Sequence, residues 1–410
     1  MNIIFRAEWR LLLFGFLLSF WSAPGQTFFI SLFSGAIREE LSLTHGQFGG
    51  IYSLATLLSA FAIIWTGSLA DRIDLKKLSF IIVFGSAIGC YLLSYSHGAV
   101  TLLISIFLVR HIGQGLSTLT SVTTMVRYLE SIKGKATAIS QTGYSLAEAI
   151  MPSIMIAMML WLGWRTTWQV TALVMIIVML PAILMLLKTH DKRHENYLNQ
   201  LQEDAINSSK AYNRRQWTRS EVLRDKRFYM FIPALLAHAI VFTGFIFHQI
   251  HLIESKGWSL ALWGVLFIIY ASIAFLFSLY SGHLIDKYGA ARLIPIGALP
   301  LGLGLLLLSI SSDTVIALCF MVLLGFSSGF VNTLSGPFFS EMYGNKHLAS
   351  IKSLSTAMMV FSSSLSPFLL GWFFDNGVAL ERLTFAGFLF VMAASSLAFY
   401  ACKLKQPPAI

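Results

Sequence analysis

The sequence predicts an all-α integral membrane protein with twelve transmembrane helices arranged as two pseudo-symmetric bundles of six. Hydrophobic residues make up 56% of the 410 residues and charged residues only 12%, about half the roughly 25% typical of a soluble domain. Apolar runs of about 18 or more residues, long enough to cross a ~30 Å hydrocarbon core, recur along the chain. A pattern repeated at a fixed offset divides the chain into two halves.

Twelve apolar segments are expected to cross the membrane. They cover residues 11–37, 45–70, 78–97, 99–128, 135–162, 167–187, 228–254, 262–285, 292–311, 314–341, 347–374 and 382–402. The first is too long for a cleaved signal peptide, and further spans follow it. The three cysteines have no paired spacing, so the sequence predicts neither a disulfide nor a metal framework.

The distribution of Lys and Arg predicts the orientation. With an even number of spans, 24 of the 29 lie on the side of the two termini, 4 lie in the opposite loops, and Arg110 lies within a span. Both termini are therefore expected to be cytoplasmic. The net charge of +10 follows from this asymmetry and suits anionic lipid headgroups, so no nucleic-acid partner is expected.

A long polar stretch separates spans six and seven. The sequence thus predicts an N-terminal bundle (1–187), a cytoplasmic linker loop (188–227) and a C-terminal bundle (228–410). The middle of the loop, residues 196–217, could form an amphipathic helix on the membrane surface. We favour a solvated linker, with a regulatory or partner-binding segment as the alternative.

The two halves repeat each other at an offset of 215 residues. GSLADRIDLKKL follows span two and GHLIDKYGAARL follows span eight, and Pro152 and Pro367 keep the same offset. Internal repeats are typical of secondary transporters, whose substrate site lies near the bilayer midplane.

These two loops resemble the signature loop of the major facilitator superfamily, and the resemblance extends over the whole chain. Asp74 and Leu75 depart from the family pattern in the first copy, and Ala290 and Ala291 depart in the second. In the family this loop latches the bundles together, with its Asp near a helix N-terminus, where a carboxylate is stabilised by about 0.3–1 kcal/mol. The latch residues implied here are Gly67, Asp71, Arg72, Gly282, Asp286 and Lys287.

Two strongly charged residues lie deep inside predicted spans, Arg110 in span four and Glu148 in span five. At about 1.5 Å per residue both fall near the middle of the core. A lone charge there costs at least ~2.5–3.5 kcal/mol, so each is expected to face a cavity and to have a partner. The repeat places Gly325 and Ser363 at the equivalent positions. Because the scaffold does not require these charges, we favour a functional pair over a purely structural ion pair.

The motif R-x-x-x-Q-G, formed by Arg110, Gln114 and Gly115, resembles the superfamily's conserved-arginine motif, which is associated with substrate or proton coupling. The longer run RHIGQGLSTLTSVTTMVRYLE resembles a bacterial branch near monocarboxylate and organic-anion carriers. Our hypothesis is that ionised Glu148 pairs with Arg110. Protonation of Glu148, favoured by burial, would release Arg110 to bind a substrate carboxylate bidentately.

Other polar residues inside spans are further candidates. His111 is either a packing histidine or a proton relay. Gln26 follows Pro24-Gly25, a helix interruption of the kind that lines transporter sites. His238 and Asn332 are expected to contact substrate, with helix packing as the alternative.

The sequence therefore predicts a secondary active transporter in the bacterial inner (cytoplasmic) membrane that carries a small organic anion together with protons by alternating access. Its expected partners are this substrate, protons and membrane lipids, and the chain is expected to be a monomer. No Walker loop or nucleophile elbow is present, so neither an enzyme nor a cofactor is expected. The alternative is a proton-coupled drug or metabolite exporter, whose Gly-Pro signature in span five is missing. A receptor on a transporter scaffold is a third possibility, for which the central loop is short.

Overall fold

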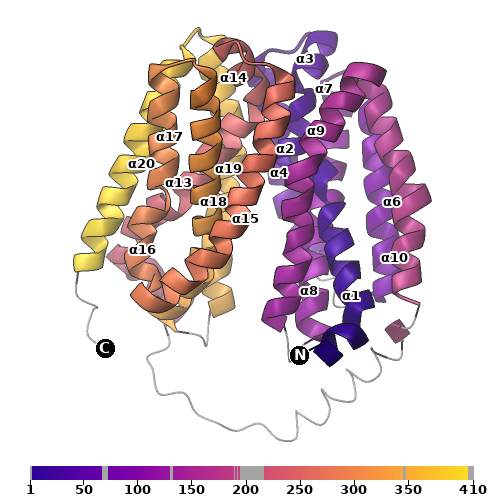
Figure 1. Cartoon of the computed structure of the whole chain (residues 1–410), viewed down its shortest axis with the longest axis horizontal. Helices are drawn as coiled ribbons and strands as arrows, with labels where there is room; N and C mark the ends of the chain where they lie inside the picture. The colour runs from indigo at the N-terminus through magenta and orange to yellow at the C-terminus, as the bar shows by residue number, and fades with distance from the viewer. Residues whose placement is uncertain are drawn as a thin grey trace, which may run out of the picture. The chain divides into compact units, whose positions relative to one another are not determined.

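Every regular element of the described chain is a helix (Figure 1). The computed structural model describes residues 2–66, 73–129, 133–188, 190, 191, 193, 217–344 and 348–404. The helices group into two compact units, one formed by Met1–Leu43 and Leu54–Tyr212 and the other by Thr44–Ser53 and Asn213–Ile410. The predicted all-α membrane fold is confirmed. The exact limits of the predicted bundles and linker stay a prediction.

The first unit contains a bent first span, followed by helices that are interrupted at several places. Its elements are α1 (Asn2–Phe20), η1 (Ala23–Gly25), α2 (Thr27–Ile30), η2 (Ser31–Phe33), α3 (Ser34–Leu41), α4 (His45–Thr66), α6 (Leu75–Ser94), α7 (Ala99–Leu108), η3 (Val109–Leu116), α8 (Ser117–Tyr128), α9 (Lys133–Val174), η5 (Met175–Met179) and α10 (Leu180–Leu186). The elements η3 and η5 are π-helical, with one residue more per hydrogen-bonded turn than an α-helix.

The second unit also takes in the first turns of α4, because Thr44–Ser53 groups with it. Its other elements are α12 (Arg219–Arg224), α13 (Lys226–Phe247), α14 (Gln249–Lys256), α15 (Leu260–Tyr288), α16 (Ala290–Gly297), α17 (Leu299–Ile310), α18 (Thr314–Tyr343), α19 (Leu348–Asp375) and α20 (Leu380–Lys403).

Ten helical stretches of the described chain are long and apolar enough to span a membrane, and the pair Glu8–Gly25 and Thr27–Leu41, bent by 44°, makes an eleventh. One of the ten, Ala136–Leu186, has 51 residues. At about 1.5 Å per residue it would be more than twice as long as a ~30 Å core. It breaks at Gly163, where φ is +77°. Counting its two arms separately gives twelve passes, and the break lies between predicted spans five and six.

Small residues let α1, α8 and α9 pack closely. Ser117 Oγ donates to the Leu18 carbonyl and Ser121 Oγ to the Gly15 carbonyl, each at 2.8 Å. A Cβ on Gly143 of α9 would lie 2.1 Å from the Phe16 carbonyl oxygen, so only glycine fits there. Close backbone approach of this kind is typical of membrane helices. It fixes α9, which carries Glu148, and α8, which directly follows the element η3 that carries Arg110.

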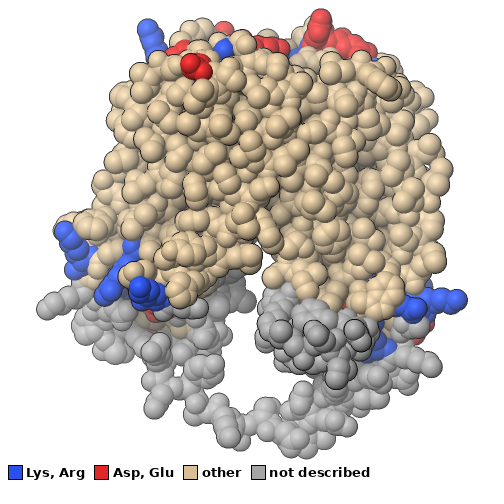
Figure 2. Space-filling model, in the orientation of Figure 1, with Lys and Arg blue, Asp and Glu red and all other residues tan. Residues whose placement is uncertain are grey.

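Charged side chains are concentrated at the ends of the helices. On the face drawn in Figure 2, each unit shows Lys, Arg, Asp and Glu at its two ends and uncharged side chains over the band between them. This pattern is expected for helices surrounded by hydrocarbon, because a charged side chain is costly at the bilayer centre.

Candidate functional site

Arg110 lies where the fourth predicted span changes from an α-helix to a π-helix. The π-helical element η3 contains Arg110, His111 and Gln114 and separates α7 from α8. The Arg110 side chain is buried, with 6% of its residue surface exposed. Its Nη1 donates to the Gly25 carbonyl oxygen at 3.1 Å and to the Thr27 hydroxyl at 3.5 Å. The π-helix therefore presents a buried guanidinium to the bend of the first span.

The bend of the first span is formed by Ser22–Gln26. Pro24 lies within the short 3₁₀ turn η1, and Gln26 has an extended backbone before α2 begins. Gly25 touches the π-helix directly, because an added Cβ would lie 2.3 Å from the Val109 carbonyl oxygen. Gln26 is buried, and its Nε2 donates to Ser22 Oγ at 3.2 Å. Two backbone irregularities thus pack against each other, and non-helical backbone at membrane depth is tolerated only within protein or beside a cavity.

Glu148 lies on α9 and is also buried, with 5% exposed. The Tyr144 hydroxyl, one turn earlier, donates to Glu148 Oε1 at 3.3 Å. The Tyr144 ring packs edge-on against Phe28, with 6.1 Å between ring centroids. Phe28 directly follows Thr27, a contact of Arg110. The bend of the first span is therefore linked by contacts to both buried charges. A direct Arg110–Glu148 ion pair stays a prediction.

The neighbours of Arg110 on η3 point to different partners. His111 Nε2 lies 3.1 Å from the Thr66 hydroxyl at the end of α4, and its ring stacks on Phe107 at 5.4 Å. Gln114 is half-buried. The contacts of His111 are those of a packed side chain, and its predicted role as a proton relay stays a prediction.

His238 lies in the second unit between two serines of α18. Its Nδ1 is 3.2 Å from Ser327 Oγ and its Nε2 is 3.1 Å from Ser328 Oγ. Ser327 Oγ also donates to the Gly297 carbonyl at the junction of α16 and α17, and Tyr270 bonds to Ser328. Through the two serines, His238 of α13 is therefore linked to α15, α16 and α18. Contact of His238 with substrate stays a prediction.

Several other predicted residues lie outside the described structure. Gly67, Asp71 and Arg72 belong to the undescribed residues 67–72, and the side chains of Asp286 and Asn332 are also not described. Gly282 and Lys287 lie on α15. The predicted latch is therefore still a prediction. So is the amphipathic linker helix, since 196–216 are not described.

Asp375, at the end of α19, was missed by the sequence analysis. Its carboxylate accepts hydrogen bonds from the Thr44 hydroxyl at 2.7 Å, the His45 amide at 3.0 Å and the Gly46 amide at 2.7 Å. Thr44 and Gln47 also form a reciprocal capping pair, which the spacing T-x-x-Q could have revealed. The long-range acceptor could not be found that way.

Aromatic contacts surround this cap within the second unit. The His45 and His251 rings are 4.5 Å apart, and the His251 and Phe374 rings are 4.3 Å apart. His248 Nε2 donates to the Pro367 carbonyl at 2.8 Å. The start of α4 is therefore held by a carboxylate and by ring packing together.

Comparisons with known proteins agree with this architecture. The model of the Major Facilitator Superfamily matches residues 13–367 and 244–409. The crystal structure of nucleoside transporter NupG is similar, with a TM-score of 0.74 and 15% identity over 96% of this chain and 100% of that one. A bacterial homolog of the human lysosomal transporter Spinster, in an inward-facing and occupied conformation, has a TM-score of 0.70 and 15% identity over 97% and 96%. A search of curated proteins finds no match.

Proposed function

This chain belongs to the major facilitator superfamily and is a secondary transporter, and we propose that it carries a small organic anion of the carboxylate class together with protons. The buried Arg110 of η3, whose guanidinium contacts the bend of the first span, carries this proposal. Alternating access would expose that site to the two sides of a bacterial inner membrane in turn. The Lys and Arg distribution supports cytoplasmic termini.

The contacts of Arg110 support an anionic ligand. Gly25 and Thr27 accept hydrogen bonds from its Nη1, and these contacts orient the guanidinium. A guanidinium carries five N–H donors and binds a carboxylate in a bidentate fork. In the proposed cycle, a substrate carboxylate that enters beside the bend replaces ionised Glu148 as the counter-charge that a buried cation requires.

Glu148 supports proton coupling. It accepts a hydrogen bond from Tyr144, whose ring packs against Phe28 just after the bend. In the proposed cycle, Glu148 is protonated when Arg110 holds the substrate and ionised when the substrate has left. Proton and anion then cross in the same direction. Gln26, Gln114 and His238 are proposed to contact the uncharged parts of the substrate.

The substrate class is tested by thermal unfolding of the detergent-purified protein with mono-, di- and tricarboxylates, nucleosides and lipophilic cations. A ligand that binds only the folded state stabilises it by RT ln(1 + [L]/Kd). Stabilisation by a carboxylate, stronger at acid pH and lost in Arg110→Ala, is expected. Stabilisation by lipophilic cations that persists in Arg110→Ala would instead favour the exporter.

Glu148→Gln is expected to retain binding but lose proton coupling, because the amide mimics the protonated carboxyl and cannot release a proton. In proteoliposomes, the variant should exchange labelled carboxylate across the membrane yet fail to accumulate it when an inward pH gradient is imposed. Glu39→Gln, at an exposed position of α3, is the control and should accumulate substrate as the wild type does. Full gradient-driven accumulation by Glu148→Gln would rule out this acid as the coupling group.

The Asp375 cap is proposed to be released during transport. Thr44–Ser53 groups with the second unit and the rest of α4 with the first, so a movement of the units would have to bend α4 after Ser53 or break the cap at its start. Asp375→Ala removes an acceptor shared by three donors, and losing a cap costs about 0.5–2 kcal/mol. We expect a cysteine placed at Gln47 to react several-fold faster with an impermeant thiol reagent in this variant.

The matched control is Asp313→Ala. Asp313 Oδ1 accepts from the Val315 amide at the start of α18, so the same residue type is lost from another helix start. Faster labelling at Gln47 in both variants, or in neither, would contradict a specific role for Asp375.

A further inference from the structure

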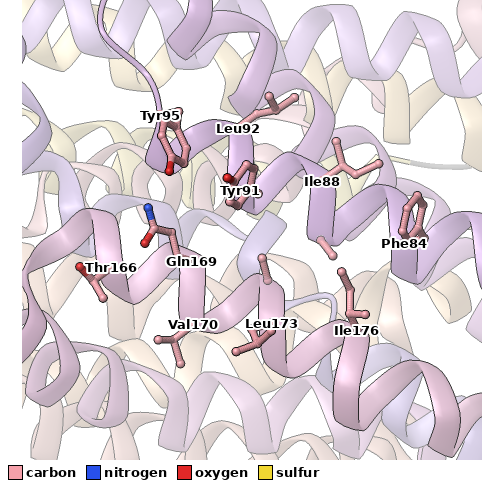
Figure 3. A pocket seen from close by; sticks show the side chains of 12 residues that line it. Phe84, Ile88, Tyr91, Leu92, Tyr95, Thr166, Gln169, Val170, Leu173 and Ile176 are labelled. Atoms are coloured by element: carbon pink, nitrogen blue, oxygen red, sulfur yellow. The ribbon is translucent and has the colours of Figure 1, made fainter.

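A groove on the first unit lies between α6 and the second arm of α9 together with η5 (Figure 3). Its volume is about 710 Å³, within the roughly 300–1,000 Å³ of small-molecule sites. Both walls belong to candidate membrane spans. Phe84, Tyr91 and Leu173 on these walls are 40%, 50% and 55% exposed in the whole chain. In a membrane, the medium that reaches them is lipid.

The polar groups of the groove are gathered at one end. Figure 3 shows Tyr91 of α6 and Tyr95, directly after α6, facing Gln169 and Thr166 of α9 there. The Tyr91 and Tyr95 rings are 4.9 Å apart. Tyrosine is enriched where a membrane meets water, since its ring is apolar and its hydroxyl is polar. This end therefore has the chemistry of the membrane interface.

The other end and the floor of the groove are apolar. Ala87 and Ala172 lie on the floor, with 1% and 4% exposed, and their small side chains leave the space open. Phe84 and Ile176 line the far end. From Phe84 to Tyr95 the groove runs along α6 for about 16 Å at 1.5 Å per residue. That is about half of a ~30 Å hydrocarbon core, or the depth of one leaflet.

Arg165 joins the two walls at the polar end. Its guanidinium donates to the Ser94 and Ser96 carbonyls at the end of α6 and to Glu40 of α3. Arg165 directly precedes Thr166 of the groove. The walls are thus held at a defined separation by groups that are not part of the lining, so the groove is built into the fold.

We propose that this groove binds one acyl chain of a membrane glycerophospholipid. The chain would lie over Ala87 and Ala172, with its glycerol and ester oxygens beside the hydroxyl and amide groups of Tyr95, Thr166 and Gln169. An amphiphile with one polar end and a tail one leaflet long matches both the polarity and the length of the groove. With cytoplasmic termini, the lipid belongs to the outer leaflet. This site is separate from Arg110 and does not depend on the substrate proposed above.

The test uses the full chain in liposomes that contain a phosphatidylcholine with a photoactivatable diazirine midway along one acyl chain. After irradiation, labelled peptides are mapped by mass spectrometry. We expect labelling to concentrate on 84–92 and 170–176. Ala172→Phe fills the floor and should reduce labelling there to the level of other exposed helices. Ala393→Phe, at an exposed position of α20, adds the same ring elsewhere and should leave groove labelling unchanged.

Ile88→Trp is a second blocking variant. Ile88 is a wall residue that is 41% exposed, so a larger side chain can enter the groove without disturbing buried packing. Loss of groove labelling in this folded variant supports the proposal. Labelling spread evenly over all exposed helices would show annular lipid only. Unchanged labelling in Ile88→Trp would also overturn it.

Discussion

Arg110→Ala is expected to abolish gradient-driven uptake of the carboxylate substrate. Truncating one partner of a buried charge pair costs about 2 kcal/mol or more, which corresponds to about thirtyfold or more in affinity. Arg110→Lys should restore little, because an ammonium group cannot offer a planar two-nitrogen fork to a substrate carboxylate while it keeps the contacts that Nη1 makes with Gly25 and Thr27. Uptake of labelled substrate into proteoliposomes and ligand-induced thermal shifts measure these losses. Arg10→Ala, at an exposed position, is the control.

A stability measurement separates this role from that of a structural ion pair. Breaking a buried pair by removing one partner costs about 3–5 kcal/mol, whereas removing both charges can be neutral. If Arg110 and Glu148 only tie helices together, Arg110→Ala should unfold at a lower temperature and an added Glu148→Gln should restore it. Transport would then return with stability. We expect transport to stay lost in the double variant, and its recovery would refute the substrate role.

Gly25→Ala is expected to disrupt the site through backbone packing. The added Cβ would lie 2.3 Å from the Val109 carbonyl oxygen and 2.5 Å from the Gln114 amide nitrogen. Both are main-chain atoms of the π-helix, so no rotamer change can relieve the contact. Overpacking typically costs about 1–3 kcal/mol, and here the strain falls on the residues that orient Arg110. The melting temperature and the substrate-induced thermal shift should both fall.

Gly113→Ala is the matched control for this change. Gly113 lies opposite Gly25 in the same contact. A Cβ added to Gly113 would come no closer than 3.5 Å to another atom, which is an ordinary van der Waals distance. Alanine is also favoured over glycine within a helix by about 1 kcal/mol. We therefore expect unchanged or slightly raised stability. Equal effects of the two alanines would show that helix propensity, and not the approach of Gly25, determines the result.

Much of the architecture could be predicted from the amino-acid sequence. Long apolar runs have few alternatives to membrane helices, because an unpaired backbone group in hydrocarbon costs several kcal/mol. For the same reason, Arg110 and Glu148 stand out in the sequence, and the structure places both in buried positions. The interruption at Pro24-Gly25 was also visible, since proline removes a backbone donor. The 215-residue offset between the two halves indicates by itself a duplicated unit.

The details that make the candidate site depend on packing between distant residues. Nothing in the run VRHIGQGL distinguishes a π-helix from an α-helix, and the change of register occurs where this run packs against residues of other spans, Gly25 among them. Asp375 caps a helix start more than 300 positions earlier in the chain, and no local pattern identifies such an acceptor. The sequence by itself therefore determined the membrane class, the duplication and the buried charges, because each follows from local polarity and spacing. The π-helix, the long-range cap and the lipid-facing groove were decided only by the tertiary structure, because each is produced by the shapes of surfaces that meet after the helices have formed.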